Sequence, residues 1–227
     1  MTQATSPDAR RTVAGILFLL ATVFTFAFME AVVKVLGQRY PVPQIVWARY
    51  VFHLLLLLPL LVRVGPARLL ATRRLGLQIG RSALLFTMTL LFFGAVSLMP
   101  LADATAILFA APLLLTALSV PMLGEHVGPR RWLGIVVGFG GVLLIVRPGA
   151  GVWDWVAALP LAAAVVYALF QIVTRIASRT EDALTTLFYT ALVGAVCMSL
   201  AVPFFWVPPS PSDWGLMVLI GLLGGVG

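Results

Sequence analysis

The stretch VAGILFLLATVFTFAFM, residues 13–29, decides the fold class of this chain. It holds no charged residue, and its few polar side chains are threonines. The apolar side chains do not alternate with polar ones as they do in the strands of a membrane barrel. A segment that is apolar on every face satisfies its backbone polar groups in lipid by forming a helix. Continued to Leu36, the run reaches the roughly 20 residues that a membrane span needs. We predict a transmembrane helix from about Val13 to Leu36.

The remainder of the chain repeats this pattern. Of the 227 residues of the whole chain, 61% are hydrophobic and 10% are charged, whereas a soluble domain carries about 25% charged residues. Further apolar segments follow at residues 44–62, 82–98, 102–123, 132–146, 155–176, 184–207 and 214–227. We therefore predict an all-α polytopic membrane protein with about eight spans. The N-terminal residues 1–12 resemble the start of a signal peptide, but the following run is too long and lacks a cleavage site, so we expect an uncleaved first span.

The arginines set the expected orientation, because positively charged loops face the cytoplasm. With the 1–12 tail in the cytoplasm, the inner side receives eleven arginines and the outer side two. The inner set is Arg10, Arg11, Arg63, Arg68, Arg73, Arg74, Arg81, Arg130, Arg131, Arg175 and Arg179, and the outer set is Arg39 and Arg147. We predict a multi-pass protein of a bacterial-type inner membrane with a cytoplasmic N-terminus.

Several kinds of function are disfavoured. The net charge of +7 comes from short loops and not from one basic face, so we expect no nucleic-acid partner. The one cysteine, Cys197, excludes a disulfide within the chain and a cysteine-rich metal site. The chain has one lysine, Lys34, which does not stand in a Walker A loop, and it has neither an H-E-x-x-H nor a G-x-S-x-G motif. We therefore predict no enzyme, catalytic residue, metal or cofactor.

A weak internal repeat relates the two parts of the chain. A shift of 141 residues places Gln171 on Glu30 and Arg175 on Lys34. Chance similarity between two apolar helices explains this match equally well. If the repeat is real, five spans separate the copies, and an odd number inverts the second copy in the membrane. Inverted repeats are typical of secondary transporters, whose site lies near the midplane between the halves.

Four stretches carry a family resemblance. They are MEAVVKVLGQRYPVPQIVWAR (29–49), PLADATAILFAAP (100–112), GEHVGPRRWLG (124–134) and GFGGVLLIVRP (138–148). As a set they resemble the EamA-type family of the drug/metabolite transporter superfamily. Within it, the acid and lysine of the first helix look most like those of S-adenosylmethionine-uptake and related metabolite carriers.

The resemblance implies two inverted repeats of five transmembrane helices. Residues 13–148 would form the first EamA-type repeat and residues 152–227 an incomplete second one of about three helices, so the fold is truncated at about eight helices. The implied activity is ATP-independent transport of a small metabolite across the inner membrane. Membrane lipid surrounds such a protein, and a homodimer is an open alternative to a monomer.

Charged residues within the spans are the first candidates for the site, because a charge at mid-bilayer costs about 2.5–3.5 kcal/mol on insertion scales. Glu30 and Lys34 are four residues apart and share a helix face. They form either a local ion pair near the outer interface or, at Glu30, a proton or substrate-amine site. Arg49 opens the next helix on the same side and could pair with Glu30 as an outer gate.

Polar residues give the remaining candidates. His53 lies one turn deeper than Arg49 and either carries a proton or bonds a neighbouring helix. Asp103 and Thr105 begin the fourth span, where an acid also serves as a cap. Tyr167 and Gln171 share a face of the sixth span and are the strongest polar pair for substrate contact, with bonding between helices as the alternative.

Taken together, these patterns favour a secondary active transporter. It would work by alternating access, driven by a proton gradient or by exchange. A non-transporting membrane scaffold or a lipid-modifying membrane enzyme is the alternative, although the loops are short and rich in arginine, which leaves an enzyme little room for catalytic residues outside the membrane.

Overall fold

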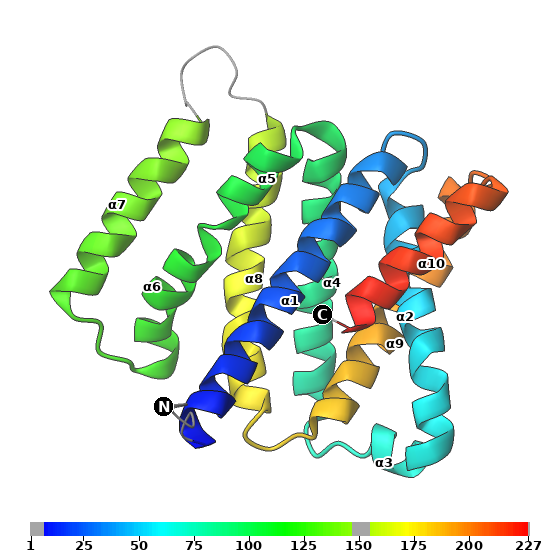
Figure 1. Ribbon diagram of the computed structural model, residues 1–227, viewed down its shortest axis with the longest axis horizontal. Coiled ribbons are helices and arrows are strands. Elements are labelled where there is room, and N and C mark those ends of the chain that lie inside the picture. The colour runs from blue at the N-terminus through cyan, green and yellow to red at the C-terminus, as the bar shows by residue number, and fades with distance from the viewer. Residues whose placement is uncertain (1–6, 147–154, 227) are drawn as a thin grey trace, which may run out of the picture.

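The computed structural model describes residues 7–146 and 155–226, and it is helical over these ranges (Figure 1). Arg147 of the predicted outer set lies outside the described residues. The longer helices are α1 (Pro7–Leu36), α2 (Val42–Val64), α4 (Leu75–Leu98), α6 (Ala111–Leu123), α7 (Pro129–Val146), α8 (Ala158–Ala177), α9 (Ala183–Ala201) and α10 (Pro211–Val226). The shorter ones are α3 (Pro66–Leu70), α5 (Leu101–Leu108), η1 (Trp155–Ala157) and η2 (Val202–Phe205).

Six of the predicted spans are confirmed as helical segments long and apolar enough to cross a membrane. They are Gly15–Leu36, Val42–Val64, Leu75–Leu98, Leu101–Leu123, Trp155–Ala177 and Ala183–Phe205. Helices α7 and α10 correspond to the other two predicted spans. The chain is therefore an all-helical, multi-spanning membrane protein.

The fourth span is not the single helix that its sequence predicts. It consists of α5 and α6, which are separated at Phe109 and Ala110. Pro112, in the first turn of α6, has no N–H to give to the carbonyl of Leu108, and its ring disfavours a helix that runs straight through. A proline at this position therefore starts a new helix, so the span bends there.

The arginine-rich segment after α2 is also more ordered than the sequence suggests. It contains the short helix α3, and α4 begins at Leu75, well before the predicted start at Ser82. Gln78 and Arg81, predicted to lie in a cytoplasmic loop, are buried side chains of α4. The mean hydropathy around these residues is too low to predict a span, but polar partners on α8 and α9 hold their side chains inside the helix bundle.

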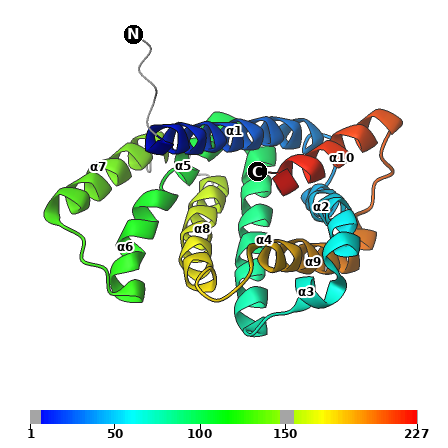
Figure 2. The ribbon, with the colours of Figure 1, turned by 60° about the horizontal axis from the view of Figure 1, so that its bottom comes forward.

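Helix α4 packs against α2, α8 and α9, and α1 lies beside α10 on one side of it (Figure 2). An inverted repeat exchanges α1 with α8, α2 with α9 and α4 with α10. Under this exchange, the contact between α4 and α8 corresponds to one between α10 and α1, and the contact between α4 and α9 corresponds to one between α10 and α2. All four contacts are present, as such a repeat requires. Figure 1 shows α1 and α8 running in opposite directions, as inversion requires. The residue boundaries of the two repeats stay a prediction.

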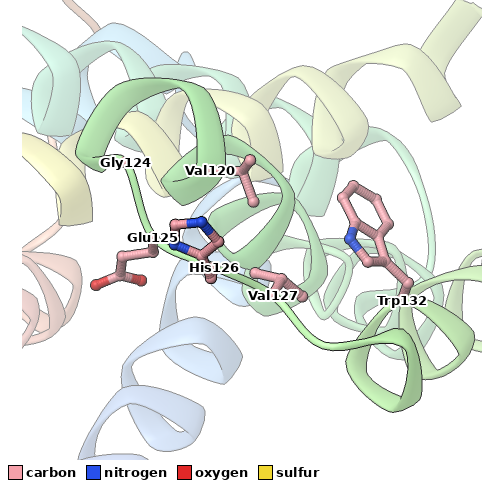
Figure 3. Close-up of a pocket in the computed structure, with 6 residues that line it drawn as sticks. All are labelled: Val120, Gly124, Glu125, His126, Val127 and Trp132. Carbon is pink, nitrogen blue, oxygen red and sulfur yellow. The ribbon is translucent and has the colours of Figure 1, made fainter.

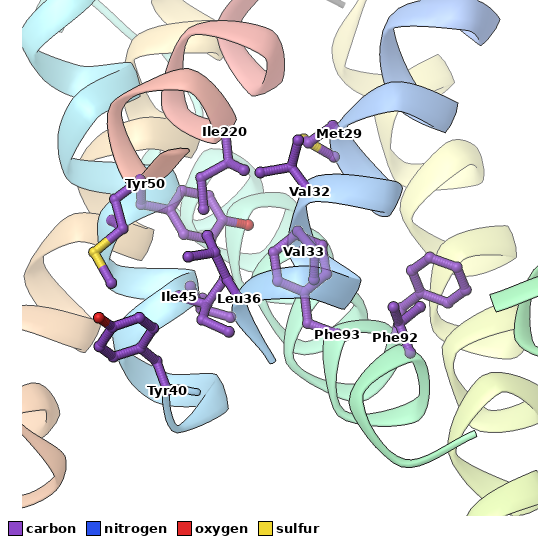
Figure 4. Close-up of a cluster of buried hydrophobic side chains, with 14 of the residues drawn as sticks. Met29, Val32, Val33, Leu36, Tyr40, Ile45, Tyr50, Phe92, Phe93 and Ile220 are labelled. Carbon is purple, nitrogen blue, oxygen red and sulfur yellow. The ribbon is translucent and has the colours of Figure 1, made fainter. Parts of the chain in front are cut away.

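The largest apolar core lies between α1, α2, α4 and α10. Val33 and Leu36 of α1 face Ile45 of α2, Phe93 of α4 and Ile220 of α10 (Figure 4). Outside this core, apolar side chains point outward along the spans; Phe18 and Phe24 of α1 are each 76% exposed. Large exposed apolar side chains along a helix are expected where lipid is the solvent.

Candidate functional site

A buried cation lies between α2, α4 and α10. Helix α2 directs Arg49 toward α4, where its Nη1 donates to the Thr89 hydroxyl at 2.5 Å. The guanidinium also lies over the rings of Tyr50 and Phe93, at 5.2 and 5.7 Å from their centroids. Arg49 is 8% exposed, its Nε is enclosed without a partner, and no acid of the described residues pairs with it.

His53 extends this polar group one turn further along α2. It is 5% exposed, and its Nε2 is enclosed without a partner. Helix α10 covers both side chains with glycines: a Cβ at Gly224 would come within 2.9 Å of Arg49 Nε, and one at Gly225 within 2.8 Å of His53 Cδ2. Helices approach closely where one of them carries small residues. Arg49 and His53 therefore both lie buried inside the bundle, while their roles stay a prediction.

The expected ion pairs of Glu30 do not form. Glu30 is half-buried on α1 and accepts one long hydrogen bond, 3.4 Å, from Thr105 on α5. Lys34 instead donates to the carbonyl oxygens of Val96 and Met99, both at 2.8 Å. These carbonyls lie at the C-terminal end of α4, where a cation is favoured. The outer gate made of Glu30 and Arg49 is therefore absent from this conformation, in which Arg49 bonds Thr89.

The other predicted residues are dispersed. Asp103 is exposed in the first turn of α5 and does not reach the Arg49 group. Tyr167 stacks on Phe170 at 5.9 Å between centroids and packs on the smaller core between α5, α6 and α8. Gln171 is half-buried on α8, and its amide makes no hydrogen bond within the described part of the chain. The structure does not bring Tyr167 and Gln171 together with Glu30 and Arg49.

A second buried arginine was missed by sequence reasoning. Arg81 on α4 donates from Nε to the Thr174 hydroxyl of α8 at 2.8 Å, and from Nη1 to the Thr190 hydroxyl of α9 at 2.7 Å. Its guanidinium lies 4.7 Å from the centroid of Phe170. Counting arginines for orientation placed Arg81 in a loop, whereas α4 begins at Leu75 and includes it.

Polar contacts close the end of the bundle that is predicted to face outward, at the turn after α1. Gln44 forms two hydrogen bonds with the backbone of Val207, at 2.8 and 3.0 Å. The Tyr40 hydroxyl donates to Asp213 at 2.8 Å, and Arg39 pairs with the same carboxylate at 2.9 Å. We call these five residues the outer latch. It joins the first predicted repeat to the loop before α10 in the second.

A similar set closes the opposite end. The Thr72 hydroxyl donates to Glu181 at 2.7 Å, and Gln78 donates to Glu181 at 3.2 Å and to Thr186 at 3.1 Å. Glu181 lies in the turn between α8 and α9, outside the spans, and the hydrogen bonds from Thr72 and then Gln78 hold the pKa of its carboxyl below the usual range. We call these four residues the inner latch, which also joins the two predicted repeats.

The two latches correspond under the shift of 141 residues. Tyr40 falls on Glu181, and Thr72 falls on Asp213. The hydroxyl–carboxylate bond from Tyr40 to Asp213 and the one from Thr72 to Glu181 are therefore counterparts, with donor and acceptor exchanged between the repeats. These matching contacts agree with the predicted repeat, which stays a prediction.

A pocket of about 390 Å³ lies elsewhere, beside the turn between α6 and α7 (Figure 3). Glu125, His126 and Trp132 line it together with apolar residues. Glu125 pairs with Arg175 of α8 at 2.5 Å. Residues of α6, α7 and the turn between them line the pocket, whereas the two buried arginines lie on α2 and α4.

The four stretches singled out in the sequence fall within one family match, apart from Pro148 at the end of the fourth. A model of the EamA-like transporter family matches residues 13–147, more than half of the chain. The chain belongs to the EamA-like transporter family. It is thus a membrane transporter of small metabolites by family, as the resemblance implied. No solved structure matches the chain.

Named relatives of this EamA-like transporter cover most of its length. It is 30% identical to an S-adenosylmethionine uptake transporter of Rickettsia bellii over 96% of this chain and 75% of the relative. It is 29% identical to a pseudopaline exporter of Pseudomonas aeruginosa, over 94% of this chain and 75% of the relative. A riboflavin transporter of Vibrio cholerae is 25% identical over 92% of this chain and 72% of the relative. These relatives are transporters and not enzymes, which decides against a membrane enzyme.

Proposed function

We propose that this protein is a secondary active transporter that moves a small metabolite across the inner membrane by alternating access, with its N-terminus in the cytoplasm. The observation that carries the proposal is the pair of matched latches, one at each end of the interface between the two repeats. Each latch ties a turn of one repeat to a loop of the other. Rocking of the repeats would open one latch while the other stays closed.

The composition of the latches suits such an exchange. Each is built mainly from single hydrogen bonds, and one such bond contributes a net of about 0.5–1.5 kcal/mol. A latch of this kind can therefore break on the timescale of transport. The Tyr40–Asp213 and Thr72–Glu181 bonds are counterparts, so the free energy lost when one latch opens is about equal to the free energy gained when the other closes. A conformational equilibrium of this kind shifts with small differences in substrate affinity.

Glu30 is the residue that we assign to proton coupling. It is half-buried within a span, it forms no ion pair among the described residues, and its one hydrogen bond, from Thr105, is long at 3.4 Å. Asp103, the other acid of the six candidate spans, is also unpaired but is exposed. An acid within a membrane span is a functional candidate by default. Exchange of one substrate for another is the alternative driving force, and it does not require Glu30 to titrate.

Uptake by the full-length protein in proteoliposomes tests both parts of the proposal. The panel contains labelled S-adenosylmethionine, amino acids, riboflavin and purines, each offered with and without an inward proton gradient. We expect one compound to accumulate with the gradient. The Glu30→Gln variant has no carboxyl group to carry a proton, and we expect it to lose gradient-driven uptake by about tenfold, which corresponds to about 1.4 kcal/mol.

Glu125→Gln is the matched control, because Glu125 lies in the pocket beside α6 and α7 and should leave uptake unchanged. If no compound moves under any condition, the transporter proposal fails for this protein. If uptake ignores the proton gradient and Glu30→Gln behaves as the wild type, the protein works by exchange or facilitation and Glu30 has a structural role.

A further inference from the structure

We propose that Arg81, with Thr174 and Thr190, forms a subsite for a carboxylate group of the transported substrate. This inference rests on the proposed function and adds the chemical class of the substrate. It concerns a different residue from those that the sequence pointed to. Three observations carry it: the charge is uncompensated, one edge of the guanidinium is free, and the partners come from both repeats.

The charge of Arg81 has no acidic partner in the described part of the chain. Its three hydrogen bonds go to the hydroxyls of Thr174 and Thr190 and, at 3.5 Å, to the carbonyl oxygen of Thr186. The ion pairs of the described residues involve Arg39, Arg68 and Arg175 instead. Buried charges are normally paired, so a cation that is 8% exposed and bonded only to neutral groups suits an anion that arrives from outside.

One edge of the guanidinium remains available. Nε and Nη1 donate to the bundle, while Nη2 donates to no atom of the described residues. The enclosed side-chain atoms without a partner include Nε of Arg49 but no atom of Arg81. The Nη2 edge of Arg81 is therefore not sealed in the core, and it can be reached by solvent or by a ligand. The same holds for Nη2 of Arg49, which donates to no atom of the described residues, and only Nε of Arg49 is enclosed, beneath Gly224.

The surroundings fix the orientation of this edge. The guanidinium plane is held by two hydroxyls and by the ring of Phe170, which stacks in turn on Tyr167. Because the guanidinium plane is held in this way, the N–H groups of Nη2 point in a fixed direction, and a carboxylate oxygen can accept a charge-assisted hydrogen bond from them. A substrate cation would be repelled here, and the single positive charge is neutralised by one carboxylate.

The position of the subsite explains how a carboxylate could drive the conformational change. Arg81 belongs to the first repeat, whereas Thr174 and Thr190 belong to the second. When the repeats rock, the distance between Arg81 and these hydroxyls changes, so the affinity for a carboxylate differs between the two conformations. A ligand shifts a conformational equilibrium only by such a difference in affinity. Thr190 is also the counterpart of Arg49 under the 141-residue shift, which places this subsite at the mirrored depth in the inner half.

Binding to the purified full-length protein in detergent tests the subsite without any transport step. The probes are amino acids and dicarboxylic acids, each paired with the amide of the same compound, and binding is followed by the shift in unfolding temperature and by calorimetry. We expect at least one acid to bind about tenfold more tightly than its amide. Arg81→Gln should abolish this preference, and Arg81→Lys, which keeps the charge but not the fixed direction of the Nη2 N–H groups, should weaken acid binding about fivefold.

Arg68→Gln is the matched control, because Arg68 is an exposed arginine on α3 at the same end and its contact with Asp182 is long, at 3.9 Å. It should keep the full preference for the acid. The inference is overturned if no acid binds, if acid and amide bind equally, or if Arg81→Gln and Arg81→Lys both retain the preference. Because binding is measured without a gradient, a failure here is distinct from the absence of uptake in proteoliposomes, which would count against the transporter proposal.

Discussion

Replacing Arg49 by methionine is expected to leave the protein as stable as the wild type and to lower kcat/KM for its substrate by about tenfold or more. Stability should hold because Arg49 is buried without an acidic partner, and replacing a buried charge by an apolar residue of similar size is often neutral or stabilising. No group is left unsatisfied, since the Thr89 hydroxyl also donates to the carbonyl of Leu85 and contacts the Tyr50 hydroxyl.

Transport should fall because Arg49 is retained inside the bundle despite its cost, which is expected of a functional residue within a membrane. A hydrogen bond to a charged group contributes about 1.5–3 kcal/mol, which corresponds to a loss of tenfold to hundredfold. The measurements are the unfolding midpoint in detergent and initial uptake rates. Arg63→Gln, at the exposed end of the same helix, should change neither. A variant that unfolds more readily but transports normally would show that Arg49 is structural.

The second large effect concerns the contact between α2 and α10. Gly221→Ala should destabilise the protein by about 2 kcal/mol relative to Gly215→Ala. A Cβ at Gly221 would lie 3.1 Å from Cα of Phe52 and 3.2 Å from the backbone nitrogen of His53, so the helix backbones themselves would have to separate. Overpacking of this kind typically costs about 1–3 kcal/mol.

Gly215 provides the control on the same helix, because a Cβ there meets nothing within 4 Å. Alanine has the better helix propensity, by about 1 kcal/mol, so Gly215→Ala should be neutral or stabilising. The free energies of unfolding can be compared by titrating the denaturing detergent sodium dodecyl sulfate into mixed micelles. Equal stability of the two variants would mean that α10 does not pack on α2 as described here.

The sequence predicted the helical class and the positions of the spans because both depend on local hydropathy. The run at residues 13–29 and the spacing of the arginines are signals of this local kind. The bend at Phe109 has a local cause in the sequence, since Pro112 has no N–H to donate to the carbonyl of Leu108. That the break divides the span into two helices depends on how α5 and α6 each pack, which a single proline does not specify.

The site was harder to predict because it depends on partners far apart in the sequence. Lys34 was expected near Glu30, four residues away, but it binds the end of α4, more than sixty residues away. Arg81 was assigned to a loop because hydropathy counts an arginine as an end of a span. The threonines that accept its hydrogen bonds look unremarkable in the sequence. The latches were missed for the same reason, although the 141-residue shift already aligned their residues.

Cross-linking each latch in turn tests alternating access most directly. With Cys197→Ala as background, Gln44→Cys with Val207→Cys spans the outer latch, and Gln78→Cys with Thr186→Cys spans the inner one. A short reagent with two methanethiosulfonate groups bridges each pair, and a reducing agent releases it. The single-cysteine variants treated in the same way are the controls. We predict that bridging either pair stops uptake in proteoliposomes and that reduction restores it; uptake that continues at its full rate with either pair completely bridged would contradict the account.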